Sequence, residues 1–176
     1  MCISPIEGTT REGTTVRLQR ALGQCRIAIE DAAAAQARDR LDLLWRNPIF
    51  APLPGTVRER LAAQLVPVSA SVDDSIIREG DDGDRFFLVA EGRLDVIAKH
   101  NHVATLRPGD HFGEIALLHD STRTATIVAK TPVRLYALTA EDFLSAIKNH
   151  PASRQAAEGS VATRLAELQH VLAHTA

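Results

Sequence analysis

The chain has 176 residues, of which 45% are hydrophobic and 24% are charged, and its formal net charge is -2. This balance is typical of a folded globular domain and excludes a disordered or fibrous chain. The near-neutral charge argues against direct nucleic-acid binding, because such domains usually carry a basic stripe or patch. No apolar run is long enough to span a membrane, and residues 1–13 lack the apolar centre of a signal peptide.

The two cysteines, Cys2 and Cys25, both lie near the N-terminus and have no metal-ligand spacing. We therefore do not expect a disulfide framework of the kind found in secreted domains. Together with the missing leader and membrane span, this predicts a cytoplasmic protein.

The first region, residues 1–46, is a polar segment followed by an expected helical extension. Apolar residues recur at helical spacing over residues 14–46, at Leu18, Leu22, Cys25 and Ile29 and again at Leu41, Leu43, Leu44 and Trp45. We expect one long helix or two shorter ones, ending at Asn47-Pro48 because a residue before proline disfavours the helical conformation. The helix either packs on the next domain or connects it to a partner.

The second region, residues 47–150, begins with a short helix and continues as strands. Thr56 is the expected N-cap of the helix, with Glu59 completing a capping box. Short apolar or alternating runs then follow, separated by Gly, Asp, Asn and Pro. The expected strands are 66–72, 75–78, 86–90, 93–98, 102–106, 125–129 and 133–138. Many short strands at this spacing predict a sandwich, jelly roll or barrel.

Helices return at the C-terminus. Thr139 and Asp142 predict a helix start, and His150-Pro151 predicts a break. In the third region, residues 151–176, an apolar stripe of Val161, Leu165, Leu168 and Leu172 predicts an amphipathic helix. This helix either packs on the sheet or serves as a lid or a dimer seam.

Residues 112–127, FGEIALLHDSTRTATI, lie between two expected strands and are too polar at their centre to form either. Gly113 lets the backbone approach a bound group, and the helix-forming run after it would begin with unpaired amides. Arg123 supplies a forked cation for paired phosphate oxygens. Glu114 can accept hydrogen bonds from sugar hydroxyls, and a threonine stands on each side of Arg123. The pattern fits an anion that carries a sugar and a base.

This segment resembles the phosphate-binding cassette of cyclic-nucleotide-binding domains, whose pattern is F-G-E-x-A-L and then R-[TSA]-A-T. Residues 77–92, IREGDDGDRFFLVAEG, resemble the glycine-rich hairpin of that family, and residues 106–112, LRPGDHF, resemble its lead-in to the cassette. The three ordered motifs make the match highly specific. The family includes catabolite activator proteins, cyclic-nucleotide-dependent kinases and gated channels. Its fold is mainly β, a double-stranded β-helix (jelly-roll-like β-roll) with N- and C-terminal α-helices.

The resemblance implies a set of ligand-binding residues: Gly113, Glu114, Ile115, Ala116, Arg123, Thr124 and Ala125. Glu114 would bind the ribose 2′-hydroxyl, Arg123 would pair with the cyclic phosphate, and the amides of Ala116 and Thr124 would complete the cradle. The C-terminal helix, around residues 161–172, would close over the base. Gly80, Gly83 and Gly92 would be turn glycines, and Phe86 and Leu88 would belong to the barrel core.

The resemblance implies a cyclic mononucleotide as the regulatory ligand and no metal. In some members of the family a threonine just after the arginine bonds the guanine amino group, which favours cGMP. Thr124 can equally serve as a backbone donor and a small polar wall, so the sequence leaves cAMP and cGMP open, and we expect cAMP.

The sequence leaves two alternatives to a nucleotide sensor. One is a degenerate domain that keeps the fold, has lost the ligand and acts as a protein-interaction module. The other is a cupin-like metal enzyme, for which His100 and His102 offer H-x-H while the glutamate expected shortly after is missing. A DNA-binding helix-turn-helix output is not expected in the tail after His150, which holds one helix stripe.

The sequence therefore predicts a non-catalytic sensor, not an enzyme, that relays nucleotide binding through movement of its flanking helices. A protein partner or a fused effector is expected, a homodimer through the flanking helices is possible, and neither nucleic acid nor a membrane span is expected.

Overall fold

The computed structural model describes residues 33–173. The chain divides into two compact units, Met1–Arg38 and Asp39–Ala176, and the fold below is that of the second. The expected stripe at residues 18–29 lies outside the described residues. A helix covers residues 33–46 and ends just before Asn47-Pro48, as the sequence predicted. No helix in the described part of the chain is both long and apolar enough to cross a membrane.

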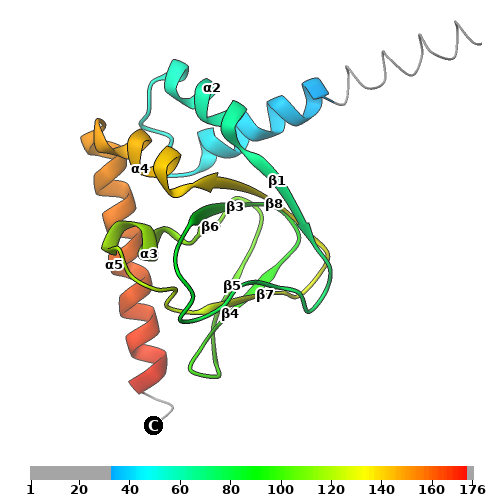
Figure 1. The fold of residues 1–176 in the computed structure, drawn as a ribbon, viewed down its shortest axis with the longest axis vertical. Helices are drawn as coiled ribbons and strands as arrows, with labels where there is room; N and C mark the ends of the chain where they lie inside the picture. The colour runs from blue at the N-terminus through cyan, green and yellow to red at the C-terminus, as the bar shows by residue number, and fades with distance from the viewer. Residues whose placement is uncertain (1–32, 174–176) are drawn as a thin grey trace, which may run out of the picture. The chain divides into compact units, whose positions relative to one another are not determined.

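The strands and helices follow one another as the sequence predicted, with one addition (Figure 1). They are α2 (Gly55–Gln64), β1 (Val66–Ala70), β2 (Ser75–Ile77), β3 (Arg85–Glu91), β4 (Leu94–Ala98), β5 (Asn101–Leu106), β6 (His111–Phe112), α3 (Glu114–His119), β7 (Thr126–Ala129), β8 (Val133–Thr139), α4 (Ala140–Lys148) and α5 (Pro151–Ala173). The short strand β6 was not predicted, because two residues are too few to show an alternation.

Two antiparallel four-stranded sheets form the roll. Their strand orders are β1-β8-β3-β6 and β2-β7-β4-β5. Strand β8 pairs with both β1 and β3. The last strand of the roll therefore lies between its first and third strands. This is the β-roll with flanking helices that the sequence predicted.

Strand β3 shows how the sequence creates two cores. Its residues Phe86 and Leu88 face a cluster formed with the helices, whereas Phe87 and Val89 face the space between the two sheets. Neighbours along a strand point to opposite faces, and both faces of β3 are covered, so all four side chains are buried. Phe86 stacks on Phe143 of α4 at a ring-centroid distance of 4.6 Å, and this contact helps to anchor the C-terminal helices on the sheet.

One expectation about a helix end needs correction. The capping box at Thr56 is wrong, because α2 begins at Gly55 and Pro54 is its N-cap, with the Pro54 carbonyl accepting from the amides of Val57 and Arg58. The break at His150-Pro151 separates α4 from α5, as predicted, and α5 starts at Pro151, the first residue of the expected C-terminal region. Proline is well suited to the first position of a helix, where its missing N–H has no partner to lose.

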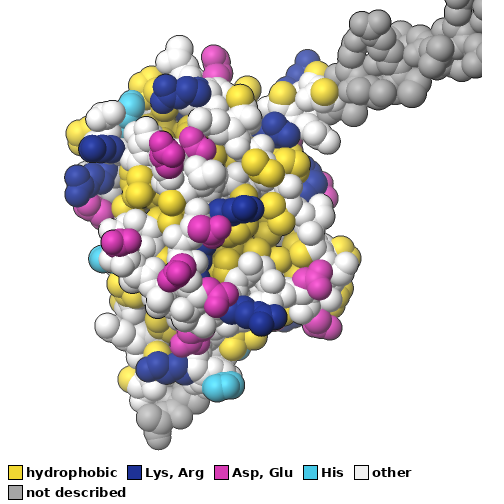
Figure 2. All heavy atoms as spheres, in the orientation of Figure 1, with side chains coloured by type: hydrophobic (Ala, Val, Ile, Leu, Met, Phe, Trp, Pro, Cys, Tyr) yellow, Lys and Arg dark blue, Asp and Glu magenta, His cyan; other side chains and the backbone are white. Residues whose placement is uncertain are grey.

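Helix α5 packs against α3, α4 and β5, and so runs along one side of the roll (Figure 1). On the face shown in Figure 2, hydrophobic side chains gather over the middle of the roll and charged side chains of both signs surround them. Because α5 contacts both α3 of the cassette and β5 of the roll, these three parts lie close together.

Candidate ligand-binding site

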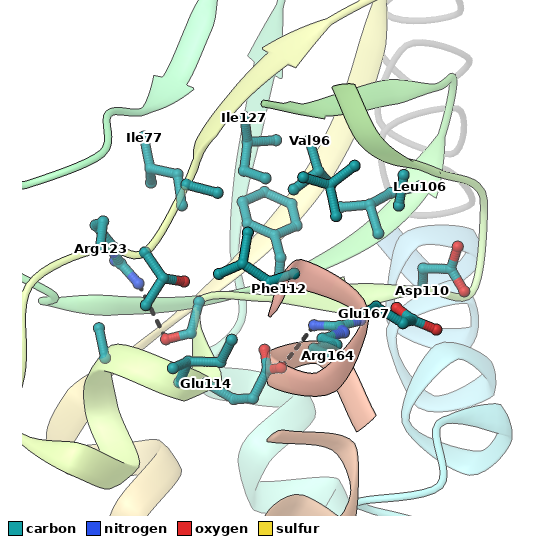
Figure 3. Close-up of a pocket in the computed structure, with 18 of the residues that line it drawn as sticks. Ile77, Val96, Leu106, Asp110, Phe112, Glu114, Arg123, Ile127, Arg164 and Glu167 are labelled. Carbon is teal, nitrogen blue, oxygen red and sulfur yellow. Dashed lines mark hydrogen bonds and ion pairs between the residues drawn. The ribbon is translucent and has the colours of Figure 1, made fainter. Parts of the chain in front are cut away.

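A cavity of about 340 Å³ lies between the roll and α5. Every residue that the sequence implied as ligand-binding lines it: Gly113, Glu114, Ile115, Ala116, Arg123, Thr124 and Ala125. Apolar side chains from five strands form one wall: Ile77, Val96, Val103, Leu106, Phe112 and Ile127. Figure 3 shows Arg123, Glu114 and Arg164 opposite that wall. The volume is that of a site for one small molecule.

Glu114 is the first residue of α3, and its side chain is fully buried. Arg164 of α5 donates from Nη1 to Glu114 Oε1 at 2.6 Å (Figure 3). The other carboxyl oxygen, Oε2, is buried and has no hydrogen-bond partner among the described residues. Burial raises the pKa of Glu114, and the charge and hydrogen bonds of Arg164 act in the opposite direction. A buried acceptor without a donor is costly, so Oε2 is suited to accept from a hydroxyl of a bound molecule.

Arg123 lies on the segment between α3 and β7, and its side chain is only 2% exposed. Its Nη1 donates to the Gly113 carbonyl at 3.0 Å, and its Nη2 donates to the Arg85 carbonyl at 2.8 Å. Nη2 also lies 3.5 Å from Asp84 Oδ1, which is a weak contact. These bonds use three of the five N–H donors of a guanidinium, and the group keeps its positive charge in proteins. Arg123 therefore brings a fixed cation with remaining donors to the cavity wall.

Gly113 lies next to both charged residues, because it directly precedes Glu114 and its carbonyl accepts from Arg123. Its φ of +93° lies in the left-handed region, where side chains other than hydrogen are strained. A Cβ at this position would lie 2.7 Å from both Arg123 Nη1 and the Arg85 carbonyl oxygen. The backbone can approach the guanidinium this closely only because residue 113 has no side chain. Gly83 has a similar role, since a Cβ there would lie 2.5 Å from the Cβ of Ala116.

The site thus combines in one cavity a buried cation, an apolar wall and a buried carboxyl oxygen that has no partner among the described residues. These are the groups that an anionic sugar with an attached flat base requires. Residues 67–150 match the family model described as Cyclic nucleotide-binding domain. This segment is a cyclic nucleotide-binding domain.

The cyclic nucleotide-binding domain is similar to kinase regulatory subunits. The "cAMP-dependent protein kinase regulatory subunit" of Schizosaccharomyces pombe is 33% identical over 120 residues, covering 64% of this chain and 29% of that protein. The protein of the same description from Yarrowia lipolytica is 40% identical over 111 residues, covering 61% of this chain and 30% of that protein. The chain therefore spans about three tenths of the length of these curated relatives.

The fold of the domain also has solved counterparts. The structure of cAMP-bound PfPKA-R superimposes with a TM-score of 0.71 at 26% sequence identity, and the match covers 80% of this chain and 49% of that chain. The arrangement of two antiparallel sheets and flanking helices is thus the β-roll of kinase regulatory subunits.

The sequence analysis expected the C-terminal helix to close over the base, but it did not identify Arg164 and Glu167 of that helix as residues of the site. Arg164, Glu167 and Leu168 of α5 line the cavity, but only Leu168 belonged to the predicted apolar stripe. A signal was present, because Arg164 follows Val161 by three positions and precedes Leu168 by four, so a cation interrupts the apolar face. Neither helix spacing nor composition could show that the cation pairs with Glu114, which lies 50 positions away.

The histidines of the cupin-like reading are not assembled into a metal site. His102 Nε2 lies 3.3 Å from Asp95 Oδ1 and 3.1 Å from Thr105 Oγ1. Within residues 33–173 there is no group of three or more His, Cys, Asp and Glu side chains that could hold a metal ion.

Proposed function

We propose that this chain binds a cyclic mononucleotide, cAMP, in the cavity between the roll and α5 and acts as a non-catalytic regulatory domain. The observation that carries the proposal is the presence of two buried groups in one cavity: Glu114, whose Oε2 has no partner within residues 33–173, and Arg123, which has remaining guanidinium donors. The descriptions of the relatives as cAMP-dependent regulatory subunits support the choice of ligand.

Each part of the ligand has its own residues. Arg123 pairs with the cyclic phosphate, helped by the amides at the start of α3, which no side chain within residues 33–173 caps. Glu114 Oε2 accepts from the ribose 2′-hydroxyl. The base lies against the apolar wall, near Thr124 and the α5 residues Glu167 and Leu168. Gly113, Ile115, Ala116 and Ala125 line the cavity around the sugar and phosphate.

Binding is relayed by a shift of α5 and not by a reaction. Arg164 joins α5 to Glu114, so a ligand that bonds Glu114 also changes the environment of Arg164. A ligand can shift an equilibrium only by its differential affinity for the two states, and this shared contact supplies that difference. The partner is a protein, a kinase catalytic subunit by analogy with the relatives, and residues 47–150 and 151–176 act as the nucleotide-binding and lid parts.

Titration calorimetry of the chain with cAMP, cGMP and adenosine tests the proposal. We expect micromolar or tighter binding of cAMP, which is about −8 kcal/mol. Adenosine lacks the phosphate and should bind far more weakly, because it cannot use Arg123. If a folded sample bound none of the three, the degenerate reading, in which the domain serves only to hold a partner, would replace the sensor.

A further inference from the structure

His111 is a buried histidine that the ligand-binding account does not use. It forms the first residue of β6 and is 5% exposed. Its ring stacks on Phe86 at a centroid distance of 5.5 Å and an angle of 21°. It does not line the cavity, although it lies two positions before Gly113. A buried imidazole must satisfy both of its ring nitrogens, and both are bonded here.

The neighbouring groups determine which ring nitrogen carries the proton. Asn47 Oδ1 accepts from the Ile49 amide at 3.1 Å, so the Asn47 side-chain nitrogen faces His111. Asn47 Nδ2 then donates to His111 Nδ1 at 3.0 Å. Because Nδ1 accepts, the proton of the neutral ring is on Nε2, which donates to Ser160 Oγ of α5 at 3.0 Å.

The main chain of His111 makes a second connection to α5. Its carbonyl oxygen accepts from Arg164 Nη2 at 2.6 Å, while Nη1 of the same guanidinium holds Glu114. Ser160 and Arg164 are four positions apart and lie on one face of the helix. His111 is therefore fixed to α5 at two successive turns, one of which also holds the carboxyl group at the cavity.

On its other side His111 reaches the turn that follows the 33–46 helix. The Asn47 amide donates to the Leu43 carbonyl at 3.1 Å. The Asn47 carbonyl accepts from the amides of Phe50 and Ala51 at 3.1 and 2.9 Å. Asn47, which is fully buried, thus organises the turn at residues 47–51 and ties it to the preceding helix.

We propose that His111 couples the two flanking segments, so that the turn at residues 47–51 follows α5 when a nucleotide enters the cavity. The proposal rests on the proposed function, because it is the ligand that moves α5. A shift of Ser160 would stretch the bond from Nε2, and leaving that donor unpaired in the interior is costly. The imidazole therefore moves with α5, and Asn47 moves with the imidazole. His111 is a positioning residue and does not touch the ligand.

The single tryptophan of the chain reports on this coupling. Trp45 lies two positions before Asn47, and the Arg58 guanidinium carbon lies 3.4 Å from its ring centroid. Trp45 is 57% exposed and lies far in sequence from the cassette. We expect its fluorescence to change on addition of cAMP in the wild-type chain.

Asn47→Ala and Ser160→Ala remove the two ends of the coupling, and both residues lie outside the cavity lining. Calorimetry should give cAMP affinities within about threefold of wild type, while the cAMP-induced change in Trp45 emission falls to less than about half. Exposed residues of the same types supply the controls: Asn149→Ala at the end of α4 and Ser145→Ala within α4 should keep the full change. If Asn47→Ala does not fold, Ser160→Ala still tests the coupling, because it removes only one oxygen and should leave the chain folded.

Two results would overturn the proposal while leaving the ligand site intact. One is an unchanged Trp45 response in Ser160→Ala with wild-type cAMP affinity. The other is a nitrogen NMR spectrum that places the His111 proton on Nδ1, because that ring could not accept from Asn47. An absence of binding heat in the wild-type chain would instead remove the proposed function, and the proposal with it.

Discussion

Glu114 and Arg164 lie 50 positions apart, yet Arg164 Nη1 donates to Glu114 Oε1 at 2.6 Å, while Oε2 has no partner in the described part of the chain. The ion pair therefore has two effects. It compensates a carboxylate that is fully buried, and it keeps one oxygen of that carboxylate available inside the cavity. The pair also connects the cassette to α5, which is the helix expected to respond to the ligand.

The first prediction concerns the hydroxyl that Oε2 accepts. Glu114→Gln should weaken cAMP binding by about 1–1.5 kcal/mol, or roughly 5- to 12-fold, because a charged acceptor is replaced by a neutral amide. The same substitution should have a much smaller effect on 2′-deoxy-cAMP, which lacks the hydroxyl. Glu141→Gln, at an exposed position in the first turn of α4, is the matched control. An equal loss for both ligands would remove the 2′-hydroxyl from the role of Glu114.

The second prediction concerns the close approach at Gly113. Gly113→Ala introduces a Cβ at a positive φ and 2.7 Å from Arg123 Nη1, so it should displace the guanidinium and weaken cAMP binding at least about tenfold. Gly159→Ala is the matched control, because Gly159 lies inside α5 with open space around it. That variant should bind cAMP normally and gain about 0.5–1 kcal/mol in the free energy of unfolding. Normal binding by Gly113→Ala would contradict the geometry at this turn.

Thr124 provides a test of base preference. If its hydroxyl bonds the guanine amino group, Thr124→Ala should lower cGMP affinity by about 1 kcal/mol, or roughly fivefold, and leave cAMP affinity unchanged. Thr122→Ala, on the exposed side of Arg123, should alter neither. Competition binding of both nucleotides measures the ratio. An unchanged ratio in Thr124→Ala would assign the residue to the cavity wall and its backbone alone.

His111 should make the chain less stable in acid. Burial, and then the charge of Arg164, lowers the pKa of His111 from 6.5 to about 3. Between these pH values the unfolded chain binds a proton that the folded chain does not bind. The free energy of unfolding therefore falls as the pH drops through this window, by up to about 1.4 kcal/mol per pH unit.

Denaturant unfolding of wild type and His111→Gln at about pH 7 and about pH 5 measures this contribution. Glutamine keeps polar groups at the site but does not titrate, so the variant should lose less stability on acidification than wild type. The same loss in both proteins would show that His111 titrates normally in the folded chain.

Much of this structure could be predicted, and the reasons differ between parts. The strands could be predicted because each is a short apolar or alternating run. In β3, for example, the apolar run 86–89 packs against a covered surface on both faces. The cassette was visible because Gly113, Glu114 and Arg123 are close in sequence and their spacing matches a known pattern. The N-cap expected at Thr56 was wrong because Thr56 lies inside α2, which begins at Gly55 and has Pro54 as its N-cap.

The remaining features depend on contacts between distant segments. The pairing of Arg164 with Glu114 and the connection of Asn47 through His111 to Ser160 join residues 49 to 64 positions apart. No local pattern marks such partners, because each residue taken alone resembles an ordinary surface or core position. These contacts connect the roll to its flanking helices, and only the folded structure shows them.

Calorimetric titration of cAMP into Arg123→Ala, with Arg93→Ala as an exposed arginine control, tests directly whether the cavity between the roll and α5 binds the nucleotide. Arg123→Ala should lose about 1.5–3 kcal/mol, or roughly 10- to 150-fold in affinity, because the charge-assisted contact with the cyclic phosphate is gone. Arg93→Ala should bind as wild type does. Wild-type affinity in a folded Arg123→Ala protein would contradict the assignment of this cavity as the nucleotide site.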